Sequence, residues 1–135
     1  MSGPSLDAVL DTLLPGDADW PAGGALDLAA SVTEDVGAET LRTLLDRLPP
    51  HFAAGDVDRR EAALRTIEAE LPDAFARLVD AAYLAYYTAP AVRAVIERVT
   101  GYEARPPQPL GYELEPFDEH LVEKQRQRAP FWRKA

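Results

Sequence analysis

Apolar residues recur at helical spacing along most of this chain. Behind Ser5, a good capping residue, the first segment holds Leu6, Val9, Leu10 and Leu13 at positions i, i+3, i+4 and i+7. This spacing is that of one face of an α-helix. Gly and Pro then divide the chain into similar segments. The pattern predicts five more helices: about 25–36, one carrying Leu41 to Leu48, one capped by Asp56 or Asp58, 72–87, and one opened by Pro90 and closed by Gly101.

The segment over 72–87 is apolar on more than one side. We expect such a helix to be central in its bundle, or to face a partner as well as the core. The inward positions of the neighbouring segments include Val57 and Val99. Within the segment over 72–87, the buried stripe is predicted to hold Phe75, Leu78, Val79, Ala82, Tyr83 and Tyr86, whereas Leu84 and Tyr87 lie off this stripe.

After Gly101 the character of the chain changes. Four prolines and three aromatic residues lie between Tyr102 and Phe117, a composition typical of an extended segment. Residues 118–127 are predicted to form one short helix. No part of the chain alternates apolar and polar residues as a strand does. The sequence therefore predicts an all-α fold: a bundle of five to six helices at 1–101 and an extended, Pro-rich and aromatic C-terminal arm at 102–135.

Charge and composition narrow the classes of function. The chain has 23 acidic and 14 basic side chains, a net charge of −9 and no Cys. Nucleic-acid binding is disfavoured, because it depends on clustered Lys and Arg. The longest uncharged stretch, Ala81 to Val92, is shorter than the roughly 20 residues that a membrane span needs. No leader is visible before Asp7, so a cytoplasmic location is expected.

Few residues suggest chemistry. We interpret His51 as a polar group at a helix end. We interpret Asp17 and Asp19 as turn formers, because the sequence around them lacks the further oxygen ligands of a calcium loop. The remaining cluster, Glu115, Asp118 and His120, predicts helix capping, with a divalent metal site as the alternative. No catalytic, cofactor-binding or metal-ligating residue is predicted in this chain.

Two interpretations of the aromatic arm stay open. Its rings could cover the chain's own bundle, or they could contact another protein, since aromatic residues and Arg are enriched at interfaces. The second interpretation makes the arm dispensable for folding. Together with Trp20 in the N-terminal part of the chain, the aromatic residues that we expect to contact a partner are Tyr102, Tyr112, Phe117 and Trp132.

Three motifs occur in an order that resembles a known family. They are Leu10-Asp-Thr-Leu-Leu-Pro-Gly-Asp-Ala-Asp-Trp-Pro21, Ala85-Tyr-Tyr-Thr-Ala-Pro-Ala-Val92, and Gly101-Tyr102 followed by Pro106-Pro-Gln-Pro-Leu-Gly-Tyr112. In this order the chain is similar to the gluconate 2-dehydrogenase subunit 3 family, the small subunits of flavin-dependent sugar and polyol dehydrogenases.

The resemblance implies a non-catalytic accessory subunit. Its partner would be a large subunit of the glucose–methanol–choline oxidoreductase type, which holds FAD and the substrate pocket. Family members commonly begin with a twin-arginine leader, and this sequence shows none. The alternative function is a free-standing helical binding or adaptor domain that forms a homodimer through the face from Tyr83 to Tyr87.

Overall fold

Every regular element among the described residues is helical. The computed structural model describes residues 4–103, 105 and 115–128 of the 135 in the chain. The prediction of an all-α bundle is confirmed, with no strand in the part of the chain that the structure describes. The helices are α1 (Pro4–Leu13), α2 (Ala29–Val36), α3 (Ala38–Leu45), α4 (Val57–Glu70), α5 (Pro72–Thr88), α6 (Pro90–Thr100) and α7 (Glu123–Arg126), with 3-10 turns η1 (Gly23–Ala25), η2 (Phe52–Ala54) and η3 (Glu119–Val122).

Proline, glycine and one aspartate set most helix boundaries where the sequence predicts them. Pro72 and Pro90 are the first residues of α5 and α6, a position where the missing N–H costs nothing. Gly101 ends α6 in the left-handed conformation. Asp56 caps α4, and its Oδ1 accepts from Arg59 N at 2.9 Å.

Two predicted helix starts are wrong. The first helix begins at Pro4, so Ser5 lies inside it and is not its cap. The second begins at Ala29 and not near Ala25. The residues before Ala29 are held by α1 instead, because Gly23 N donates to Leu14 O and Gly24 N donates to Asp11 Oδ1, each at 2.8 Å.

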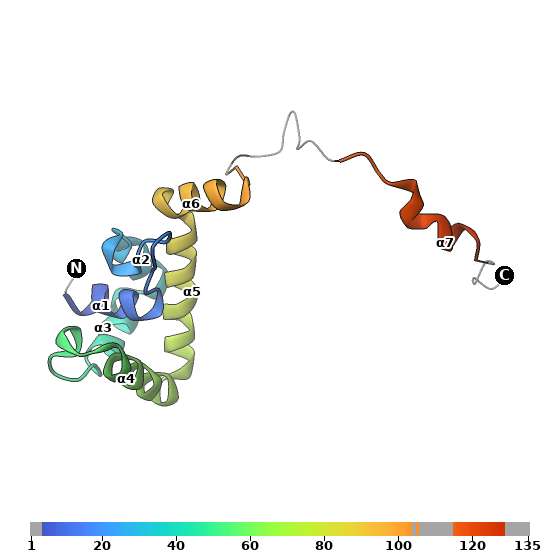
Figure 1. Ribbon diagram of the computed structural model, residues 1–135. Helices are drawn as coiled ribbons and strands as arrows, with labels where there is room; N and C mark the ends of the chain where they lie inside the picture. Colours follow the sequence, from blue (N-terminus) through green and yellow to red (C-terminus); the bar gives the residue numbers. More distant parts are fainter. Residues whose placement is uncertain (1–3, 104, 106–114, 129–135) are drawn as a thin grey trace. The chain divides into compact units, whose positions relative to one another are not determined.

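Helix α5 is the centre of the bundle, as its apolar faces predict. It packs against α2, α3, α4 and α6, and Figure 1 shows it running along the other helices, with α6 across its end. At 25 cal/mol per Å², each fully buried leucine contributes about 1.5–3 kcal/mol. The side chains that α5 buries are Phe75, Leu78, Ala81, Ala82, Ala85 and Tyr86.

Three residues predicted to point inward are exposed. Tyr83 is 46% exposed because it lies at the edge of the buried stripe of α5, next to Ala82. Val57 opens α4 and is 53% exposed. Along α6 the exposed fraction of the side chains rises from 0% at Val92 to 56% at Val99, so the last turn of this helix lies outside the core.

By its contacts the chain divides into two units, Met1–Ala104 and Arg105–Ala135. The described part of the second unit confirms the predicted short helix near 118–127, formed by η3 and α7. Asp118 caps it, with Oδ1 accepting from His120 N at 3.0 Å. None of the residues of η3 and α7 is buried.

Among the described residues, no helix combines the length and the apolar character that a membrane span requires.

We predict that a chain ending at Glu103 folds on its own. The core residues belong to α1–α6, η2 and the segments between them, all of which this chain retains. Circular dichroism should show a helical protein with one cooperative thermal transition, within about 1 kcal/mol of the stability of the full chain. An unfolded or non-cooperative product would mean that the arm is part of the core.

Candidate functional site

The loop between α1 and η1 forms a closed turn around Asp17. Asp17 Oδ1 accepts from Asp19 N at 2.8 Å and from Trp20 N at 2.9 Å, while Asp17 N donates to Trp20 O at 2.9 Å. Gly16 enters the turn at a φ of 68°, which favours glycine. The turn-forming interpretation of Asp17 is therefore confirmed.

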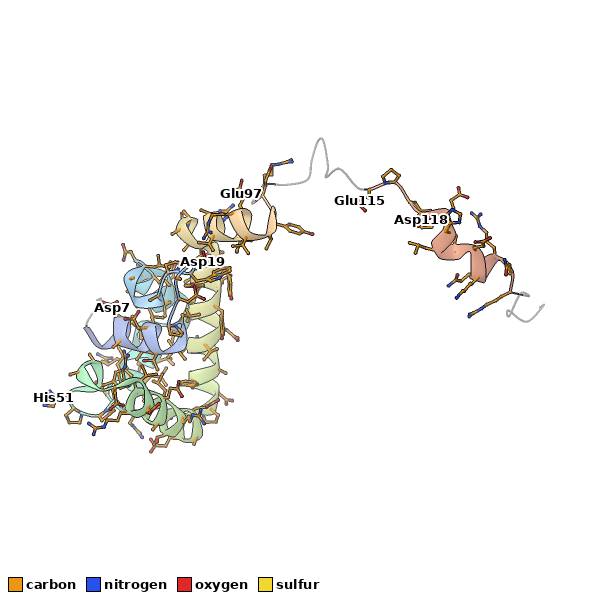
Figure 2. The ribbon with its side chains drawn as sticks, viewed as in Figure 1. Asp7, Asp19, His51, Glu97, Glu115 and Asp118 are labelled. Atoms are coloured by element: carbon orange, nitrogen blue, oxygen red, sulfur yellow. The ribbon has the colours of Figure 1, made fainter. Side chains whose placement is uncertain are left out.

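Asp19 has a different role from the one predicted. Its Oδ1 accepts from both terminal guanidinium nitrogens of Arg98 at 3.1 Å, so it joins the loop to α6 (Asp19 is labelled in Figure 2). Both side chains are more than half exposed. A pair of this kind contributes at most about 1 kcal/mol, so it orients the loop more than it stabilises the bundle.

The buried Tyr86 attaches this loop to the central helix. Its hydroxyl donates to Pro21 O at 2.7 Å, across 65 positions of sequence. Tyr86 is only 4% exposed, so the phenol ring is in the core and its hydroxyl reaches the surface loop. The loop and α5 therefore form one continuous surface.

A shallow groove of about 330 Å³ lies between the loop and α5. Trp20 is half-buried on the loop side, and Tyr83 and Tyr87 are 46% and 50% exposed on the helix side. Exposed aromatic residues gathered in one place are typical of binding surfaces. We call this feature the aromatic groove; it is lined by Leu13, Leu14, Pro15, Gly16, Asp17, Trp20, Tyr83, Tyr86 and Tyr87.

The tyrosine rings of the groove are ordered by contact with one another. Tyr83 and Tyr87 are stacked, with centroids 6.2 Å apart and planes 12° apart. Tyr86 and Tyr87 meet edge to face at 5.3 Å and 89°. Each such pair contributes about 0.5–1.5 kcal/mol beyond burial. The exposed rings are thus held in place before any partner arrives.

Within residues 4–103, 105 and 115–128, the two titratable groups with perturbed pKa values are both in the groove. The backbone N–H of Trp20, followed by that of Asp19, lowers the pKa of Asp17 by stabilising its carboxylate. Burial raises the pKa of Tyr86, with smaller contributions from Tyr87 and Asp17. At neutral pH the groove therefore presents a negative charge on Asp17 beside a neutral phenol.

Of the two predicted interface aromatics that the structure describes in the first unit, Trp20 and Tyr102, only Trp20 lines this groove. Trp20 lines it, whereas Tyr102 follows α6, is 69% exposed and does not line it. Phe117 belongs to the second unit and is 67% exposed. Tyr112 and Trp132 lie outside the described residues.

The other candidate residues do not assemble into a site. Asp118 caps η3, and His120 Nδ1 lies 3.8 Å from Glu123 Oε2. Figure 2 labels Glu115 and Asp118, and across the described positions no three His, Asp or Glu side chains meet as a metal site requires. His51 precedes η2 and does not end α3; its side chain makes no capping hydrogen bond, and its backbone adopts a left-handed φ of 62°.

The sequence did not predict that the loop carrying Trp20 and Pro21 contacts helix α5. The buried stripe predicted for α5 is right for Tyr86 but wrong for Tyr83, which is exposed together with Tyr87. The only available signal was the spacing itself, because stacked partners at i and i+4 share a helix face. The contact with Pro21 has no local signature.

The chain was compared with known protein families, curated proteins and solved structures. No family model, curated protein or solved structure matches the chain. The resemblance to the gluconate 2-dehydrogenase subunit 3 family therefore rests on the sequence motifs. Two of these motifs meet in the structure, since Tyr86 of the second donates to Pro21 of the first.

We predict that Gly16→Ala disrupts the loop. A Cβ at this position would lie 2.6 Å from Ala22 N and 2.7 Å from Trp20 O, in addition to the cost of a positive φ. We expect a loss of at least about 2 kcal/mol in urea unfolding. Gly101→Ala is the matched control: its φ is also positive and its backbone is left-handed, but no atom lies within 4 Å of the added Cβ, so it should lose only about 1 kcal/mol. Equal losses would contradict the packing of the loop.

We predict a second effect at Tyr86. Tyr86→Phe removes the hydrogen bond to Pro21 and should cost about 1 kcal/mol at pH 7. Because the folded pKa is raised, the contribution of the neutral phenol is complete below the unfolded pKa of about 10 and is lost as pH rises through the folded value. Urea unfolding from pH 7 to 11 measures the free energy of unfolding. It should fall less with rising pH in Tyr86→Phe than in Tyr83→Phe, the exposed control.

Proposed function

We propose that this chain is the non-catalytic small subunit of a flavin-dependent oxidoreductase that acts on a sugar or glycoside. The catalytic partner would be a large subunit of the glucose–methanol–choline type, which would hold FAD and the substrate pocket. The role of this chain would be to stabilise the large subunit by covering part of its surface. The aromatic groove would provide the contact.

One observation carries the proposal. Two motifs of the family resemblance, Leu10 to Pro21 and Ala85 to Val92, contribute the residues that line the aromatic groove, apart from Tyr83. The hydrogen bond from Tyr86 to Pro21 joins them. The segments by which the chain resembles the family are therefore the segments that form its aromatic surface. Such a coincidence is expected if the motifs serve docking.

The exposed side chains of α5 support a docking role for this face. Beside Tyr83 and Tyr87, Leu84 is 59% exposed on the same helix. Tyrosine is among the residues that dominate binding energy at protein interfaces, where it combines a large contact area with few rotatable bonds. Covering these rings would remove apolar surface from water at about 25 cal/mol per Å².

The test is co-purification from the native host. We expect affinity-tagged full-length chain to retain a flavin-containing protein with the absorbance spectrum of FAD. The double variant Tyr83→Ala/Tyr87→Ala should retain at least about ten-fold less flavoprotein, because hot-spot rings are lost from the contact. Val57→Ala is the control, since Val57 is equally exposed on α4 but does not line the groove.

Two outcomes would contradict the proposal. A stable monomer that retains no flavoprotein would remove its basis. Self-association that depends on protein concentration, without a flavoprotein, would favour the homodimeric adaptor instead, because the stacked pair of Tyr83 and Tyr87 lies on the exposed face of α5. Analytical ultracentrifugation of the purified chain distinguishes these two results.

A further inference from the structure

We propose that the aromatic groove binds a proline-rich segment of the partner protein, in polyproline II conformation, with an Arg or Lys seated beside Asp17. This inference rests on the proposed function, because it names the part of the partner that the same surface would hold.

The rings form a platform of suitable spacing. Aromatic-lined grooves recognise proline-rich segments because the pyrrolidine rings pack flat on aromatic faces and the extended chain has little conformational entropy to lose. Tyr83 and Tyr87 are nearly parallel and 6.2 Å apart. A polyproline II helix rises about 3.1 Å per residue, so two residues span the distance between the ring centroids. Trp20 lines the groove from the loop side.

The floor of the groove is preorganised for this purpose. Tyr86 is held in place by its hydrogen bond to Pro21 and by its edge-to-face contact with Tyr87. The backbone of Trp20 is held by the turn, in which the backbone N–H of Trp20 donates to Asp17 Oδ1. A ligand would therefore order few side chains on binding, which limits the entropic cost of association.

The charge at the rim selects a basic ligand. Of the two loop carboxylates, Asp19 accepts from Arg98 at 3.1 Å, whereas Asp17 Oδ1 accepts from the backbone N–H groups of Asp19 and Trp20. Asp17 is exposed and lines the groove. A carboxylate in this position would attract a guanidinium or ammonium group at one end of the bound segment.

Charge also decides against a second copy of this chain as the occupant. Each copy has a net charge of −9, and like-charged surfaces repel when they are brought together. A basic segment of another protein gains from the same field that opposes self-association.

The experiment uses the full-length chain and the fluorescein-labelled peptide Arg-Ala-Pro-Pro-Ala-Pro-Pro-Ala. Fluorescence anisotropy should show saturable binding with a Kd below about 1 mM. A peptide with Ala for every Pro, and one with Glu for Arg, should each bind at least about five-fold more weakly, because they lose the rigid backbone and the charge respectively.

Matched variants locate the binding site. Tyr87→Ala should weaken binding at least about ten-fold, whereas Tyr87→Phe, which keeps the ring, should stay within about two-fold. Val57→Ala is the control: Val57 is 53% exposed, lies on α4 and does not line the groove, so binding should be unchanged. Asp17→Asn keeps an oxygen for the turn and should reduce both the affinity and its dependence on salt. Circular dichroism confirms that each variant is folded.

Three results would overturn the inference: no saturable binding, equal binding of the proline-free peptide, or equal losses of affinity in Tyr87→Ala and Val57→Ala. A dimer that Tyr87→Ala dissociates, without peptide binding, would assign the groove to a second copy and also overturn it. Peptide binding needs no flavoprotein. Its failure is therefore distinguishable from the failure of the proposed function, which co-purification measures.

Discussion

The hydrogen bond from the Tyr86 hydroxyl to Pro21 O is the contact on which the aromatic groove depends. It joins the central helix to a surface loop across 65 positions of sequence, with the phenol ring itself buried. Without it, neither the hydroxyl nor the carbonyl would have this partner, and a hydrogen bond of this kind contributes about 0.5–1.5 kcal/mol. The loop is therefore held where Trp20 lines the same groove as the tyrosines.

The central helix serves two purposes at once. One face of α5 buries Leu78, Ala82 and Ala85 against the rest of the bundle, and another exposes Tyr83, Leu84 and Tyr87. The small alanines let neighbouring helices approach, while the large rings lie outside that contact. Exposed apolar side chains contribute less to folding than buried ones. Their retention on the most central helix is understandable if a partner covers them.

The fold could be predicted from local signals because its helices begin and end at Pro, Gly and Asp. Pro72, Pro90 and Gly101 act through their own backbone chemistry, which needs no knowledge of the tertiary structure. The start of α2 could not be predicted in this way, since Gly23 and Gly24 are bound by groups of α1. The aromatic groove could not be predicted for the same reason, because it depends on contacts between the loop after α1 and helix α5, which are distant in the sequence.

The two pKa shifts in the groove support binding over proton transfer. An acid or base that moves protons at neutral pH needs a pKa near 7. The environment of Asp17 moves its pKa further below that range, and the burial of Tyr86 moves its pKa further above it. Each group is thereby fixed more firmly in the state it already holds at pH 7. A fixed charge beside fixed neutral rings is suited to recognising a partner, and this agrees with the proposal that catalysis belongs to another chain.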